Sequence, residues 1–136
     1  MTEVSQWNEP IVEEFRANEG RVGGPFEGLP MLLLHDIGAR SGTERIHPLA
    51  YQAVGDAFAV FGSKGGAPVD PHWVLNLVAH PEVEVEIGTE RLKVRARVLE
   101  ADEREPIWAK QKIDRPGFAD YEKKTEGIRD IPVVLL

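Results

Sequence analysis

The sequence predicts an α+β domain in which a small, mostly antiparallel β-barrel of about six strands carries an N-terminal helix and further helices on its outside. Short apolar runs bounded by glycine, proline and aspartate recur along the chain, a pattern that is typical of strands. Several of the segments between these runs are too short to hold crossover helices, so the strands should pair antiparallel. Closing the sheet would leave no long exposed edge. We expect the 136 residues to form one domain, 1–136.

The N-terminal segment predicts an amphipathic helix over residues 5–18. Its acidic residues gather toward the start, where the helix dipole favours negative charge. Its apolar residues recur at helical spacing, at Trp7, Ile11, Val12 and Phe15. A glycine-rich loop follows at 20–28, and we expect helix and loop together, residues 1–28, to lie over the mouth of a pocket.

Four apolar runs predict core strands. Residues 30–37 are too few for a typical helix and are bounded by turn signals. The runs 47–54 and 57–62 are joined by a Gly-Asp pair, which predicts a hairpin. Residues 131–136 form the last apolar run and predict a terminal strand.

Three further segments predict helices on the outside of the barrel. In residues 70–79, Asp70 predicts an N-cap and Pro71 a first helical position. Residues 101–113 open acidic and close basic, which is the order that the helix dipole prefers. A shorter helix is expected over 119–124.

The segment 82–99 alternates apolar and charged residues and predicts a β-hairpin. With Gly88 to Arg91 as the turn, acidic and basic side chains should face one another on the side exposed to solvent. The expected pairs are Glu86 with Lys93, Glu84 with Arg95 and Glu82 with Arg97. These pairs leave no uncompensated basic patch in the hairpin.

Composition and charge exclude several classes of function. A net charge of −7 and a pI near 5.1 argue against a nucleic-acid partner. Without cysteine there is no disulfide, thiolate nucleophile or Cys-ligated metal, and the four histidines lack the spacing of zinc sites, so we expect no metal. No signal-like N-terminus or apolar run of about 20 residues is present, which predicts a cytoplasmic protein.

The net charge of the chain is positive only in its middle segment. Residues 38–66 carry a net charge of +1, whereas the segments before and after carry −5 and −3. The basic residues Arg40, Arg45 and Lys64 each stand near glycines, which let a backbone approach a ligand closely. The segment Ser63-Lys64-Gly65-Gly66 resembles a backbone nest for an anion. Together these residues could bind one phosphate, although the spacing of a P-loop is absent.

Two aromatic candidates, Trp73 and Tyr121, each allow two interpretations. Trp73, just after this region, suits stacking on a flat cofactor but also core packing. Tyr121 could donate a proton to a substrate or only contact its rim. Ser41 and Ser63 do not stand in a Gly-x-Ser-x-Gly motif, so hydrolysis is not expected.

The succession of these motifs resembles the deazaflavin-dependent nitroreductase family, whose members are F420H2-dependent reductases with a split β-barrel of the FMN-binding-like superfamily. The matching pieces, in order, are Gly38-Ala-Arg-Ser-Gly42, Arg45, Pro48-Leu49, Ser63-Lys64-Gly65-Gly66, His72-Trp73-x-x-Asn76-Leu77, His80-Pro81 with Val83, Val85 and Ile87, and Ile131-Pro-Val-Val134. They extend over about residues 30–136.

The resemblance implies coenzyme F420, a deazaflavin with a phosphodiester and a polyglutamate tail, as the cofactor. The residues that it implies for binding are Arg40, Ser41, Arg45, Pro48, Ser63, Lys64, Gly65, Gly66, Trp73 and Asn76. Tyr121 matches a C-terminal tyrosine of the family and is the candidate catalytic proton donor. Arg115 and Phe118 stand where some relatives carry further tyrosines, which favours an acceptor other than nitroimidazoles.

The implied function is hydride transfer from reduced F420 to a small electron-poor acceptor, namely a quinone, an α,β-unsaturated carbonyl or lactone, or a nitro compound. Two alternatives stay open: a non-catalytic protein that binds F420 or a lipid, and an FMN-dependent oxidase of the same fold. The protein is expected to be a monomer or a homodimer. Peripheral membrane contact through residues 5–18 also stays open, although the acidic face of that helix would be repelled by anionic lipid.

Overall fold

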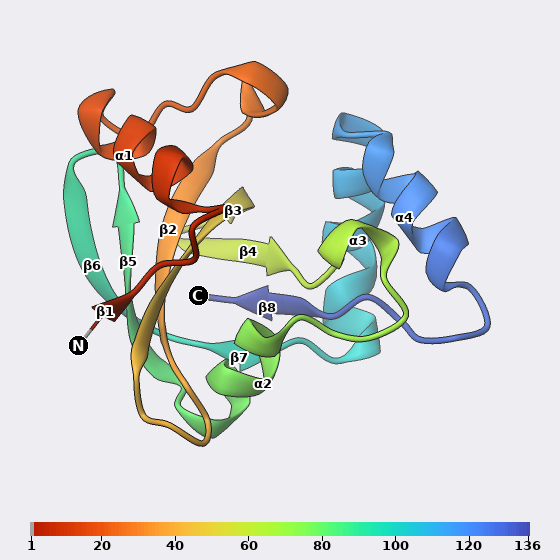
Figure 1. Ribbon diagram of the computed structural model, residues 1–136. Helices are drawn as coiled ribbons and strands as arrows, with labels where there is room; N and C mark the ends of the chain where they lie inside the picture. The colour runs from red at the N-terminus through yellow and green to blue at the C-terminus, as the bar shows by residue number, and fades with distance from the viewer. Residues whose placement is uncertain (1) are drawn as a thin grey trace.

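A computed structural model describes residues 2–136 as one strongly curled sheet with helices packed against it (Figure 1). The strands are β1 (Thr2–Glu3), β2 (Met31–Ile37), β3 (Glu44–Val54), β4 (Ala57–Phe61), β5 (Glu82–Ile87), β6 (Glu90–Arg95), β7 (Arg97–Val98) and β8 (Val133–Leu135). The helices are α1 (Glu9–Ala17), α2 (His72–Ala79), α3 (Ala101–Asp114) and α4 (Gly117–Thr125), with short 3₁₀ turns η1 (Gly24–Phe26) and η2 (Lys64–Gly66).

The predicted α+β class and the predicted order of elements are confirmed. The strand order in the sheet is β6-β5-β2-β3-β4-β8-β7, and these neighbours pair antiparallel. The sheet has eight strands instead of about six because β1 and β7 each add two residues, with β1 pairing parallel to β3. Among the described residues no helix is long and apolar enough to cross a membrane.

Strand β2 lies at the centre of the fold and is buried on both faces. Leu32, Leu33 and Leu34 have no exposed surface, which explains why its sequence is continuously apolar instead of alternating. Leu32 and Leu34 face the interior of the curled sheet, where they pack with residues of α2, β5 and β8. Leu33 faces outward and packs under α1.

Helix α1 covers the outer face of β2 and β3. Val12 and Phe15 are buried against Leu33 and Ile46, as the helical spacing predicts. Trp7 does not belong to this face, because the helix begins only at Glu9, and its side chain is 85% exposed. The prediction that Trp7 contributes to the buried side of this helix is therefore wrong.

Helices α3 and α4 lie together beside β4 and β8 (Figure 1). Trp108 of α3 is completely buried there and packs with Phe61 and Phe118. Its indole N–H donates to the carboxylate of Glu122, so the polar edge of this buried ring has a partner. Burial of aromatic surface holds the two helices against the sheet.

The β5–β6 hairpin forms, but the predicted register is wrong by two residues. The turn is the two-residue Gly88-Thr89, with Gly88 at a positive φ of 58°, because Ile87 pairs with Glu90. The observed cross-strand partners are Glu86 with Arg91, Glu84 with Lys93 and Glu82 with Arg95. A shift of two residues keeps each side chain on its expected face. Arg97 instead belongs to β7 and binds Glu103.

The predicted start of α2 also needs correction. Pro71 occupies the N-cap position and Asp70 does not cap the helix. The Asp70 carboxylate instead lies 2.7 Å from Nη1 of Arg129, which is a charge-assisted hydrogen bond and stronger than a bond to a neutral amide.

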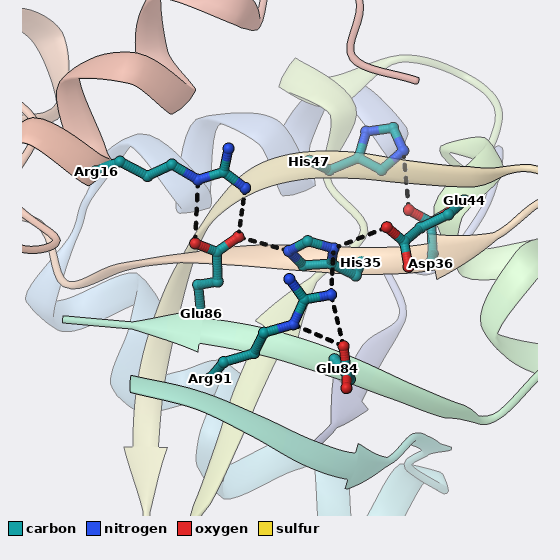
Figure 2. A network of polar contacts seen from close by, with 8 residues as sticks. All are labelled: Arg16, His35, Asp36, Glu44, His47, Glu84, Glu86 and Arg91. Atoms are coloured by element: carbon teal, nitrogen blue, oxygen red, sulfur yellow. Dashed lines mark hydrogen bonds and ion pairs between the residues drawn. The ribbon is translucent and has the colours of Figure 1, made fainter. Parts of the chain in front are cut away.

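The acidic face of β5 is not simply exposed to solvent, as the sequence had suggested. His35 of β2 is 2% exposed, with Nε2 2.5 Å from Oε2 of Glu86 and Nδ1 3.3 Å from Oε1 of Glu44. Arg16 of α1 binds Glu86 through two hydrogen bonds of 3.1 and 2.8 Å. We call these side chains, with Glu84 and Arg91, the His35 network (Figure 2). The network ties α1 to the sheet.

The pKa of Glu86 reflects this position. Burial alone would raise it, but the hydrogen bonds from Arg16 and His35 hold the pKa of this carboxyl below its ordinary value. The charged form therefore stabilises the folded state at neutral pH. Because the folded-state pKa is lowered, that contribution is lost as the pH falls through it.

Glu86→Gln is expected to lower the free energy of unfolding at neutral pH by about 1–3 kcal/mol, because Arg16 and His35 lose a charged partner. The loss of stability on acidification below about pH 5 should be smaller than in the unmodified protein. Urea unfolding followed across this pH range measures both effects.

The matched control is Glu82→Gln, since Glu82 and Arg95 form an ion pair with both side chains exposed. This control should change stability by less than about 0.5 kcal/mol. Equal stability of the two variants at every pH would contradict a stabilising role for Glu86.

Candidate functional site

The first predicted anion-binding segment is the turn between β2 and β3. Residues 38–43 form this turn, closed by hydrogen bonds from the amide of Gly38 to the carbonyl of Thr43 and from that of Gly42 to the carbonyl of Gly38. Arg40 lies exposed at its tip. The turn therefore presents a guanidinium to solvent at the end of a two-stranded ribbon.

A buried amide holds this turn from behind. Asn76 of α2 is 5% exposed; its Oδ1 accepts the backbone N–H of Ala39 at 3.0 Å, and its Nδ2 donates to Oδ2 of Asp36 at 2.7 Å. Asp36 is completely buried, and its Oδ1 lies 3.1 Å from Nε2 of His47 (Figure 2). Asn76, predicted to shape the surroundings of a cofactor, thus fixes the turn that carries Arg40.

A hollow of about 370 Å³ lies between this turn and α2. It brings together four residues of the predicted site, Arg40, Ser41, Arg45 and Asn76, with Gly38, Ala39, His72 and Leu75 completing its walls. Arg45 stands opposite Asp36 on the neighbouring strand. Two guanidinium groups, an imidazole and a hydroxyl are donors that suit a phosphate or a carboxylate.

The second predicted segment, Ser63–Gly66, follows β4 and includes η2. Lys64, Gly65 and Gly66 have φ values of 47°, 64° and 85° in succession. A Cβ at Gly65 would meet no atom within 4 Å, so the backbone there is open to a ligand, whereas a Cβ at Gly66 would lie 2.8 Å from Cδ of Lys124 in α4. The Lys64 side chain is exposed. Residues 67–71 connect the segment to α2.

Arg129 is a residue of this region that the sequence analysis missed. Its guanidinium donates to the carbonyl oxygens of Gly62, Ser63 and Ala67 and to the carboxylate of Asp70. Arg129 stands about sixty residues further along the chain, outside any motif, so no local pattern could have pointed to it.

The remaining predicted residues lie apart from the hollow. Pro48 stands on β3 opposite Leu33, half-buried. Trp73 of α2 is 5% exposed and packs in the core with Leu34. Tyr121 of α4 is half-buried, with its ring against that of Phe118 at a centroid distance of 5.4 Å. Contacts of Pro48, Trp73 and Tyr121 with a cofactor or a substrate stay predictions.

Except for Pro48, Trp73 and Tyr121, the predicted residues therefore form two groups. One group surrounds the hollow, and the other lies in the Ser63–Gly66 loop, against which α4 packs. In the described chain, Lys64 and Tyr121 are not among the residues that line the hollow.

A larger groove of about 1120 Å³ runs between the C-terminal end of α1, the following loop and the sheet. Glu14, Arg21, Met31, Tyr51 and Ile87 are among its lining residues. The N-terminal segment thus lines a groove, and that this groove belongs to the cofactor pocket stays a prediction. Over residues 2–136, no three His, Asp or Glu side chains are grouped so that they could hold a metal ion.

Comparison with known proteins identifies relatives over most of the chain. A family model described as F420H(2)-dependent quinone reductase matches residues 7–136. An F420H(2)-dependent quinone reductase of Mycobacterium tuberculosis is 35% identical over 126 residues, which are 90% of this chain and 83% of that protein. A putative F420H(2)-dependent quinone reductase of the same organism is 33% identical over 117 residues, 85% of this chain and 97% of that protein.

Solved structures agree with these matches. A structure described as an F420-H2 dependent reductase is 38% identical, with a TM-score of 0.70 over 78% of this chain and 92% of that one. A domain-swapped dimer is 33% identical, with a TM-score of 0.71 over 96% of this chain and 94% of that one. The haem storage protein HutZ from Vibrio cholerae is 15% identical at a TM-score of 0.57, over 94% of this chain and 92% of that one, and shares the fold alone. These neighbours confirm the predicted split β-barrel.

Asn76→Leu is expected to destabilise the protein by about 2–4 kcal/mol, because it leaves the buried carboxylate of Asp36 without its amide donor. The amide of Ala39 should also exchange its hydrogen faster. Urea unfolding and hydrogen exchange at that amide measure the two effects.

The control is His72→Ala, since His72 lines the same hollow with an exposed side chain. It should change stability by less than about 0.5 kcal/mol. If the Leu variant were as stable as this control, Asn76 would not anchor the turn.

Proposed function

The chain belongs to the F420H(2)-dependent quinone reductase family, and from this we propose that it binds coenzyme F420 and uses the reduced cofactor to reduce a quinone. The observation that supports this most is the hollow beside α2, which Arg40 and Arg45 both line in a chain whose net charge is −7. A protein with that overall charge needs a local cluster of donors to bind an anionic cofactor.

The donors in the two loops fit the anionic part of F420. A phosphodiester and glutamate carboxylates accept paired hydrogen bonds from Arg40 and Arg45 and a point charge from Lys64. The open surface at Gly65 lets the backbone come close to the ligand. Ser41 adds a hydroxyl at the wall of the hollow.

When bound, F420 supplies the hydride from its deazaflavin ring, so the protein has little covalent chemistry to perform. The cationic residues hold the anionic end, which sets the position of the ring. Ser63 and Pro48 border the ring in this proposal, and the barrel excludes water from it. Fixing distance and orientation in this way contributes to the rate enhancement.

Tyr121 is the proposed group that touches the acceptor. Charge develops on an acceptor oxygen during reduction, and a phenol O–H can donate a hydrogen bond or a proton to it. Helix α4 packs against η2, which places Tyr121 on the element next to the Ser63–Gly66 loop. This neighbourhood supports the role.

Quinones are the preferred acceptor class, with α,β-unsaturated carbonyl compounds second and nitro compounds last. At the two positions where some relatives carry tyrosines, this chain has Arg115 and Phe118, and both side chains make contacts within the protein. Arg115 donates to the carbonyl oxygen of Gly28 at 2.7 Å, and Phe118 packs on Trp108. Neither side chain can supply the hydroxyl that those tyrosines provide.

The other proposals concern assembly and location. One similar structure is a domain-swapped dimer, which supports a homodimer over a monomer for this chain. We also propose a cytoplasmic location and a single domain, 1–136, in which residues 1–28 lie over the pocket. Peripheral membrane contact stays open. Non-catalytic binding of F420 or a lipid and FMN oxidation are the alternatives that the experiments below separate.

Titration of the protein with F420 should show binding that weakens as salt rises, because ion pairs hold the anionic end. FMN, with one phosphate and no acidic tail, should bind more weakly. Arg40→Ala and Lys64→Ala should each weaken F420 binding about tenfold, the effect of losing one charge-assisted hydrogen bond. Cofactor fluorescence at low and high salt measures all three comparisons.

Lys110→Ala serves as the control, because Lys110 is exposed and pairs with Asp114 of its own helix. Tighter binding of FMN than of F420 would overturn the cofactor assignment in favour of the oxidase alternative.

Tyr121→Phe should lower kcat for a soluble quinone by about tenfold or more while leaving F420 affinity unchanged, because only the acceptor loses a donor. Steady-state kinetics together with cofactor titration separate these effects. A loss of F420 affinity without a loss of kcat would make Tyr121 a cofactor contact.

A further inference from the structure

The guanidinium of Arg129 lies behind the loop 62–70. Its side chain is 11% exposed. Nε donates to the carbonyl oxygen of Ala67 at 3.0 Å, and Nη2 donates to that of Ser63 at 3.1 Å. Nη1 donates both to the carbonyl oxygen of Gly62, at 3.1 Å, and to Oδ1 of Asp70, at 2.7 Å. All three nitrogen atoms of the guanidinium are therefore used on one loop.

These bonds determine which way the peptide groups of the loop face. In a planar trans peptide the C=O and the following N–H point in opposite directions. Because the carbonyls of Gly62 and Ser63 point to Arg129, the N–H groups of Ser63 and Lys64 point away from it. The carbonyl oxygens, which would repel an anion, therefore face Arg129. The amide donors face the opposite side of the loop.

Arg129 also offsets a local strain. Lys64 has a φ of 47°, in the left-handed region that a residue with a side chain rarely adopts. Such a conformation persists only where surrounding contacts over-determine it. The bonds of Arg129 to residues on both sides of Lys64, at Ser63 and Ala67, are such contacts.

The other side of the loop is held by the same part of the chain. The amide of Gly62 donates to the carbonyl of Pro132 at 2.9 Å, and the amide of Arg129 itself donates to the carbonyl of Thr125. The side chain of Lys124 lies against Gly66. The loop and the segment after α4 are therefore one packed unit, with Arg129 as its polar centre.

We propose that Arg129 is a positioning residue that holds the Ser63–Gly66 loop in the form that receives the anionic part of the cofactor. This inference rests on the proposed function, because it takes F420 as the ligand of the loop. Arg129 itself acts from behind, through the peptide groups that it orients. Lysine is not equivalent, since one ammonium cannot span acceptors that the planar guanidinium reaches with three nitrogen atoms.

The experiment compares F420 binding to the unmodified protein, Arg129→Ala, Arg129→Lys and Arg97→Ala. Arg97 is the matched control, because its guanidinium makes a two-point bond to Glu103 and both side chains are exposed. We expect Arg129→Ala to weaken F420 binding about tenfold or more and Arg97→Ala to leave it unchanged. Arg129→Lys should bind more weakly than the unmodified protein and more tightly than the Ala variant.

Two further readouts distinguish positioning from a general loss of structure. Added guanidinium ion, at constant ionic strength and at concentrations too low to denature the protein, should restore part of the F420 affinity of Arg129→Ala. With a quinone acceptor, the KM for reduced F420 should rise while kcat at saturation stays unchanged, because the loop affects binding and not the reacting atoms. A general loss of folded protein would instead lower the apparent kcat. It would neither raise the KM nor be reversed by guanidinium ion.

The outcomes separate the two levels of the proposal. If the unmodified protein fails to bind F420, the proposed function fails and this inference fails with it. If the unmodified protein binds F420 and folded Arg129→Ala binds it equally well, only the role of Arg129 is overturned. Should Arg129→Ala not fold, Arg129→Lys decides, and unchanged affinity in that variant overturns the proposal.

Discussion

Two polar residues at the C-terminal end of β2 impose the constraint on which the rest of the structure depends. The strand is buried on both faces, and its run of leucines ends in His35 and Asp36, which are 2% and 0% exposed. Buried groups of this kind are costly unless they are paired. His35 contacts Glu86 and Glu44, Asp36 accepts a hydrogen bond from Asn76, and His47 lies within ion-pair distance of Asp36 (Figure 2). Arg16 of α1 binds Glu86, and Asn76 of α2 binds Asp36, so these contacts link the two helices to the sheet.

The same constraint shapes the candidate site. Asp36 holds Asn76, and Asn76 holds the turn that presents Arg40, so the position of an exposed cation depends on a buried carboxylate. In the same way, Arg129 supports the loop that carries Lys64. Each exposed cationic loop is thus supported from behind by a polar group of low exposure. Rigid support lowers the entropy lost when a ligand binds.

Much of the fold could be predicted because its signals are local. The leucines of β2, the turn of the β5–β6 hairpin and the helix spacing of α1 depend on neighbours in the sequence. The hairpin register could not be predicted, because a two-residue and a four-residue turn at Gly88 both preserve the faces of the strands. The exposure of Trp7 also escaped prediction, since it depends on where α1 begins.

The candidate site could be predicted only in part, for a similar reason. Arg40, Arg45 and Lys64 stand beside glycines and are visible in the sequence, and Asn76 is visible through its motif. Their supports come from residues far along the chain: Asp36 lies 40 residues from Asn76, and Arg129 lies 59 residues from Asp70. His35 and Glu86, 51 residues apart, likewise meet only in the folded sheet. Such long-range polar contacts leave no periodic trace.

The most direct measurement is hydrogen exchange of the free protein and of the protein saturated with F420. If the two supported loops form the anion site, the cofactor should slow exchange in residues 38–45 and 62–67 together, whereas the surface of α3 is unaffected. Protection confined to the groove between α1 and the sheet, with both loops unchanged, would contradict the placement of the site and would locate ligand binding beneath the N-terminal helix.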